Sequence, residues 1–83
     1  MGNKIAVRVI ANGGLDIFDS PNGSYQGHYN KGDIIRTLEP DSRRPANDGK
    51  VYACYTVGGH PFMKNWVAVE DEKGYATVEQ IDY

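Results

Sequence analysis

The sequence predicts an all-β domain, a small barrel of five to seven short strands. The chain has 83 residues, which makes a single domain (residues 1–83) and is too short for a multi-domain enzyme. Ten glycines, four prolines and six tyrosines favour turns and strands over helices. Apolar residues recur in short segments with a period of two, as in strands with one buried face.

The first half of the chain predicts three strands. In the first, Ile5, Val7 and Val9 alternate onto one face. Asn12-Gly13-Gly14 follows and suits a tight turn with positive φ angles. A turn-rich loop is expected over residues 19–30, and Lys31-Gly32-Asp33 forms the next turn. The predicted strands cover residues 4–11, 15–18 and 34–38.

The second half predicts one long strand and a hairpin. Residues 39–49 contain two prolines and no periodicity, so we expect an exposed loop. Aromatic and β-branched residues are dense over 50–57, which predicts a strand. Residues 66–69 and 75–78 predict two more strands joined by an acidic turn. The closing residues 79–83 suit either a 3₁₀ turn or a last short strand.

Four short motifs, in order, resemble those of the bacterial SH3 (SH3b) family. Gly14-Leu15-Asp16-Ile17 with Ser20-Pro21 is similar to the Gly-Leu-Asn-Val-Arg-Ser-Gly-Pro opening, and Gly27 with Lys31-Gly32-Asp33 and Ile35 to Gly-x-Leu-x-Lys-Gly-Thr-x-Val. Trp66-Val67-Ala68-Val69 is similar to Trp-x-x-Val, and Gly74-Tyr75-Ala76 with Ile81 to Gly-Trp-Val…Tyr-Leu. The resemblance spans most of the chain from residue 14 and implies an SH3-like barrel.

The sequence departs from the family pattern in three places. Phe18 replaces the usual arginine, and Tyr75 replaces the usual second tryptophan. Residues 39–65 form an insertion with an apparent extra strand. This insertion would cover the usual groove, extend it, or pair with a second copy of the chain through an open strand edge.

Catalytic, metal and cofactor chemistry find little support in the sequence. Cys54 with His60 or His28 could form a nucleophile and base, but Cys54 lies within a predicted strand, where a free cysteine is usually a small buried apolar residue. The two histidines lack the spacing of a zinc site, although Asp19 could complete a set after folding. The paired glycines do not continue into a phosphate-binding motif. We therefore predict no enzyme activity, no metal and no cofactor.

Aromatic residues are more numerous than a core of this size can hold. Nine Phe, Trp and Tyr side chains occur in 83 residues, and some of them fall in predicted loops. We expect the surplus rings to form a recognition surface, although the loop tyrosines could instead cap the barrel ends. The predicted contact residues are Asp16, Tyr25, His28, Tyr29, Tyr52, His60, Phe62 and Trp66.

The sequence thus favours a binding module without catalysis. Resemblance to bacterial SH3 domains implies a peptide or glycan ligand from the bacterial cell wall. The alternative is a free-standing cytoplasmic protein, such as a phage-type inhibitor, that binds a partner protein or a small nucleotide-like ligand. It would use Arg43, Arg44 and the inserted strand, which could also lie at the interface of a homodimer. A net charge of -2 predicts no general binding to nucleic acid or membranes.

The expected location depends on whether the chain is a complete gene product. Met1 to Ala11 contains two basic residues and no apolar run long enough for a secretion signal. A complete gene product would therefore be cytoplasmic. A domain of a secreted protein would be extracellular or attached to the cell wall.

Overall fold

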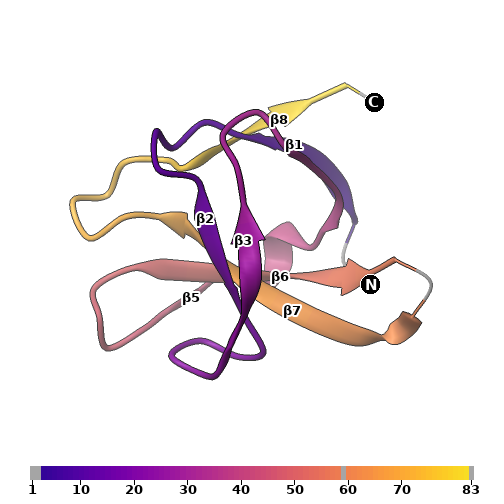
Figure 1. Cartoon of the computed structure of the whole chain (residues 1–83), viewed down its shortest axis with the longest axis horizontal. Coiled ribbons are helices and arrows are strands. Elements are labelled where there is room, and N and C mark those ends of the chain that lie inside the picture. Colours follow the sequence, from indigo (N-terminus) through magenta and orange to yellow (C-terminus); the bar gives the residue numbers. More distant parts are fainter. Residues whose placement is uncertain (1–2, 59, 83) are drawn as a thin grey trace.

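In a computed structural model that describes residues 3–58 and 60–82, the chain folds into a single antiparallel sheet of eight strands with one 3₁₀ turn. Figure 1 shows how the strands are arranged. The all-β prediction is confirmed, although the strands number eight rather than five to seven. Their bounds are β1 Ile5–Val9, β2 Leu15–Phe18, β3 Tyr25–Tyr29, β4 Ile34–Leu38, β5 Arg44–Pro45, β6 Val51–Val57, β7 His60–Glu70 and β8 Val78–Ile81, with the 3₁₀ turn η1 at Pro40–Ser42.

The sheet curls into a small barrel-like shape. Its strands lie in the order β3-β2-β7-β6-β4-β1-β8, and β5 pairs with β6 from the side. In Figure 1 the β2–β3 hairpin runs across the front of β6 and β7. The resulting body measures 30 × 25 × 24 Å.

The core lies inside this curl and comes from the alternating positions of several strands. Val7 and Val9 of β1 are buried, as their period-two pattern predicts. Ala53 and Tyr55 of β6 pack into the same cluster. The opposite face of β6 is buried as well, and η1 lies beside the strand. The core cluster consists of Val7, Val9, Leu15, Ile35, Leu38, Ala53, Tyr55, Val67, Val69 and Val78.

Three segments differ from the prediction. Residues 25–29, expected in a loop, form β3 and pair with β2. Strand β7 begins at His60 rather than at residue 66 and makes a long hairpin with β6. The expected hairpin over 66–78 is reduced to a single bridge between Glu70 and Ala76, because the last strand, 78–81, pairs with β1 instead.

The strand predicted within residues 39–65 is central in the sheet. Strand β6 pairs with β7 on one side and with β4 and β5 on the other. Within the described residues, the ends of the sheet order are therefore β3 and β8. A homodimer through the inserted strand stays a prediction, and it would require these existing pairs to open.

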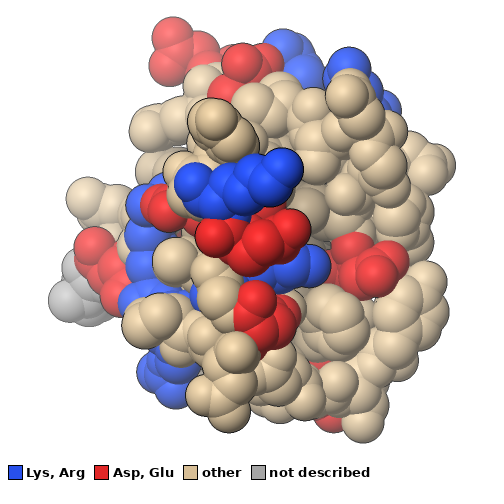
Figure 2. All heavy atoms as spheres, turned by 90° about the vertical axis from the view of Figure 1, so that its left-hand side faces the viewer, with Lys and Arg blue, Asp and Glu red and all other residues tan. Residues whose placement is uncertain are grey.

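Charges of both signs are interspersed on the surface. On the face shown in Figure 2, Lys and Arg side chains lie next to Asp and Glu side chains, without a large patch of one sign. The ion pairs Arg8–Glu79 (3.2 Å) and Arg43–Glu70 (3.1 Å) are of this exposed kind. In residues 3–58 and 60–82 no helix is long and apolar enough to cross a membrane.

Candidate functional site

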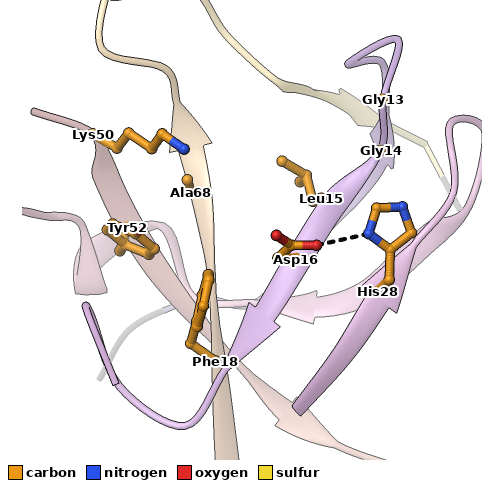
Figure 3. A pocket seen from close by; sticks show the side chains of 9 residues that line it. All are labelled: Gly13, Gly14, Leu15, Asp16, Phe18, His28, Lys50, Tyr52 and Ala68. Atoms are coloured by element: carbon orange, nitrogen blue, oxygen red, sulfur yellow. Dashed lines mark hydrogen bonds and ion pairs between the residues drawn. The ribbon is translucent and has the colours of Figure 1, made fainter. Parts of the chain in front are cut away.

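A cleft of about 170 Å³ lies where the β2–β3 hairpin meets β6 and β7 (Figure 3). Strands β2 and β3 form one wall, and the start of β6 forms the other. Charged and aromatic side chains from both walls reach the cleft. The lining residues are Gly13, Gly14, Leu15, Asp16, Phe18, His28, Lys50, Tyr52 and Ala68.

The first wall carries a carboxylate and an imidazole in contact. Asp16 and His28 are directly opposite each other on β2 and β3, so their side chains share one face of the sheet. The neighbouring Leu15 is buried on the other face, which turns Asp16 outward. Asp16 Oδ1 lies 2.9 Å from His28 Nδ1. An ionised carboxylate only accepts hydrogen bonds, so Nδ1 is the donor of this pair.

Gly14 allows His28 to occupy this position. Its φ of +74° lies in the left-handed region that glycine adopts without strain. A Cβ at Gly14 would collide with the carbonyl oxygen of Tyr29 and would come within 2.6 Å of His28 Nε2. Gly14 is therefore needed both for the backbone conformation of the turn and for the space that the His28 ring occupies.

The second wall is built around a buried tyrosine. Tyr52 is 2% exposed, and its hydroxyl donates to Asp48 Oδ2 at 2.6 Å. Burial, followed by this hydrogen bond, raises the pKa of Tyr52 above the usual range of a phenol. The same bond lowers the pKa of Asp48. Tyr52 is thus held in its protonated form, as a donor.

Lys50 carries the positive charge of the second wall. It is half-buried, and its side chain extends from the start of β6 toward the cleft (Figure 3). Its backbone N–H donates to Asp48 Oδ1 at 2.9 Å. Across the described part of the chain, no ion pair joins the Lys50 ammonium to a carboxylate.

An aromatic row borders the cleft and consists of Tyr25, Phe18 and Tyr52. The Phe18 ring meets Tyr25 edge-on at 6.4 Å between ring centroids and meets Tyr52 edge-on at 6.1 Å. Tyr25 is 62% exposed, so the row runs from the buried wall of the cleft to the open surface. Beside it, Trp66 is paired with Phe18 across β7 and β2, and the Arg44 guanidinium lies 5.3 Å from the Trp66 ring.

Five of the eight predicted contact residues thus gather at or beside the cleft: Asp16, Tyr25, His28, Tyr52 and Trp66. The expectation that some rings lie outside the core is also confirmed, because Tyr25, Phe62 and Tyr75 are exposed.

Tyr29, His60 and Phe62 do not join this group. Tyr29 lines a second cleft of about 270 Å³, where its ring lies 5.7 Å from the ring of Tyr55. His60 and Phe62 lie at the start of β7, in the hairpin that β7 forms with β6. The predicted contact set includes them because it joins the loop after the second strand to residues 39–65.

Sequence reasoning did not select Phe18 and Lys50. Phe18 is a half-buried aromatic residue near the end of a short strand, and aromatic residues at partly open positions are a signal for surface recognition. Lys50 follows a turn, and only folding brings it opposite Asp16.

The remaining chemical candidates lie apart from the cleft. Cys54 is buried, its backbone N–H donates to Ser42 Oγ at 2.8 Å, and its thiol contacts Glu39 Oε2 at 3.7 Å. Neither contact involves a histidine. In residues 3–58 and 60–82, no three histidine, cysteine or acidic side chains come together as metal ligands.

Comparisons with protein-family models, curated proteins and solved structures find no match for this chain.

Proposed function

We propose that the protein is a non-catalytic binding module that holds a peptide or glycan part of the bacterial cell wall. The observation that carries this proposal is the cleft, walled by charged groups and bordered by the aromatic row. Flat rings offer contact area at a small entropic cost, while the polar groups in the cleft fix the orientation of a ligand. The cell-wall origin of the ligand rests on the sequence resemblance to bacterial SH3 domains.

Binding, rather than a reaction, suits the groups that line the cleft. The Asp16–His28 pair could serve as a base, but no serine, threonine or cysteine is among the lining residues to act as its nucleophile. The remaining hydroxyl, that of Tyr52, donates to Asp48 and keeps its proton. These residues can therefore orient a ligand by hydrogen bonds and charge.

Sedimentation with purified peptidoglycan tests the proposal. The wild-type protein should pellet with the insoluble polymer. Tyr25→Ala should reduce the bound fraction about tenfold, because it removes the exposed ring of the aromatic row. Tyr75→Ala is the matched control, since Tyr75 is 69% exposed and does not line the cleft. A wild-type protein that stays in the supernatant, or equal loss in the two variants, would overturn the proposal.

A second candidate, capture of a partner protein, is favoured by the start of β7. Phe62 there is 97% exposed and the adjacent Met63 is 55% exposed, and exposed apolar side chains of this size often mark protein contacts. A partner recovered from cell extract by the wild type and by Tyr25→Ala, but lost with Phe62→Ser, would support this function instead.

A further inference from the structure

We propose that the cleft takes a zwitterionic group the size of one small amino acid, with its ammonium on Asp16 and its carboxylate on Lys50. This inference rests on the proposed binding function and names the chemistry of the ligand. It follows from the volume of the cleft and from the charges on its two walls.

The volume limits the ligand to a single small residue. The cleft holds about 170 Å³, close to the ~150 Å³ cavity that accommodates a benzene molecule. Sites for larger organic ligands measure roughly 300–1,000 Å³. A residue at the end of a peptide, or an amino acid, therefore fits, and the rest of a longer ligand would lie along the aromatic row.

The negative wall has one carboxylate oxygen available. Asp16 uses Oδ1 for its contact with His28, and 55% of its side-chain surface is exposed. In Figure 3 its second oxygen points away from His28 and into the cleft. An ammonium group placed there would gain a charge-assisted hydrogen bond without displacing the histidine.

The positive wall has one cation without an ion pair. Asp48, the acidic residue closest in sequence to Lys50, accepts hydrogen bonds at both oxygens, one from the Tyr52 hydroxyl and one from the Lys50 backbone. The Lys50 side chain extends toward the cleft from the wall opposite Asp16 (Figure 3). The charge of Asp48 acts on Lys50 without forming an ion pair with it, so a ligand carboxylate between the walls would be the direct ion-pair partner of the Lys50 ammonium.

Only a zwitterion satisfies both walls at once. A purely anionic ligand would be attracted by Lys50 but repelled by the nearby Asp16 carboxylate. A purely cationic ligand would be attracted by Asp16 but repelled by the Lys50 ammonium. Phe18 and Tyr52 line the same cleft and offer apolar surface to the carbon atoms of the ligand.

Four small probes test the ammonium and the carboxylate of the ligand separately. Their binding is measured by the shifts of the backbone amide resonances of the protein. Alanine carries both charges, N-acetylalanine only the carboxylate, alanine amide only the ammonium, and N-acetylalanine amide neither. We expect alanine to bind about tenfold more tightly than either singly charged probe, since a hydrogen bond to a charged group typically contributes this much or more. Equal affinity for all four probes would overturn the inference.

Two variants assign each charge to its wall. Lys50→Gln should bind alanine and alanine amide equally, and Asp16→Asn should bind alanine and N-acetylalanine equally. The asparagine oxygen can still accept from His28, so the wall should keep its shape. Lys73→Gln is the control, because Lys73 is exposed in the 71–77 turn and does not line the cleft. Unchanged discrimination in both cleft variants would contradict the assignment.

The two proposals fail separately. A protein that pellets with peptidoglycan but does not distinguish the four probes would leave the binding function standing and overturn the zwitterion site. A protein that distinguishes the probes through Lys50 and Asp16, yet stays in the supernatant, would support the site and overturn its cell-wall ligand.

Discussion

Two adjacent glycines in the turn before β2 have different roles. Gly14 has a φ of +74°, and a Cβ there would collide with the Tyr29 carbonyl oxygen and crowd His28. Gly13 has open space around the position of a Cβ, with no atom within 4 Å. The sequence shows only a glycine pair. The structure shows that Gly14 must be glycine, whereas Gly13 has room for a side chain.

We expect Gly14→Ala to lower the free energy of unfolding by about 1–3 kcal/mol, because alanine is strained at a positive φ and its Cβ would collide with the Tyr29 carbonyl oxygen. It should also weaken ligand binding, since His28 must move. Gly13→Ala should change stability by less than about 1 kcal/mol. Urea denaturation measures both variants, and equal stabilities would contradict the role assigned to Gly14.

At the scale of elements, the sequence predicts strands whose two faces differ. Alternation in 4–11 reveals β1 because Val7 and Val9 are buried and Arg8 between them is exposed. Strand β3 lacks this contrast, since Gly27 has no side chain and both Gln26 and His28 are exposed. The first part of β7 lacks it too, because Phe62, Met63 and Lys64 in succession are all exposed. Pairing with neighbouring strands, rather than local pattern, specifies these two segments.

The 3₁₀ turn η1 and β6 are connected by one serine. Ser42 Oγ donates to the Glu39 carbonyl oxygen at 2.6 Å and accepts the backbone N–H of Cys54 at 2.8 Å. Cys54 lies in a buried part of β6 that pairs with β7 on one side. The hydroxyl thus completes the hydrogen bonding of β6 where η1 lies beside it.

Ser42→Ala should cost about 1–3 kcal/mol of stability, because it leaves the buried Cys54 N–H without its acceptor. The loosened turn should also expose the thiol, so Cys54 should react faster with a soluble thiol reagent. Ser20→Ala is the control, since its hydroxyl makes one exposed contact, with Asp19 at 3.3 Å. Unchanged stability and unchanged thiol reactivity would show that η1 does not depend on Ser42.

At the scale of the whole molecule, the curl of the sheet creates the candidate site. Asp16 belongs to the first third of the chain and Lys50 to the insertion, and the crossing of the β2–β3 hairpin over β6 and β7 brings them to one cleft. Sequence reasoning selected Asp16, Tyr25, His28 and Tyr52 from residue chemistry and the surplus of rings. It could not pair them with Lys50 or separate them from Tyr29, because those relations depend on how the sheet closes.

Two tyrosines, Tyr52 in the first cleft and Tyr29 in the second, have raised pKa values in the folded chain. The stability of the fold should therefore change with pH in the alkaline range. Burial, and then a hydrogen bond with Tyr55, raises the pKa of Tyr29 above its usual 10.0. Burial, and then the bond to Asp48, does the same for Tyr52. Above pH 10 the folded chain therefore keeps protons that the unfolded chain has lost. This stabilisation is complete below the usual pKa and is lost as the pH rises toward the folded values.

We expect the free energy of unfolding to fall as the pH increases above about 10, and Tyr29→Phe and Tyr52→Phe each to flatten that decline. Urea denaturation at a series of alkaline pH values measures the slope, and Tyr75→Phe, at an exposed position, is the control. The Tyr29 ring contacts Tyr55, and the Tyr52 hydroxyl donates to Asp48, so the two tyrosines have different partners and their effects should add in the double variant. A double variant that retains the wild-type slope would show that other groups control alkaline unfolding.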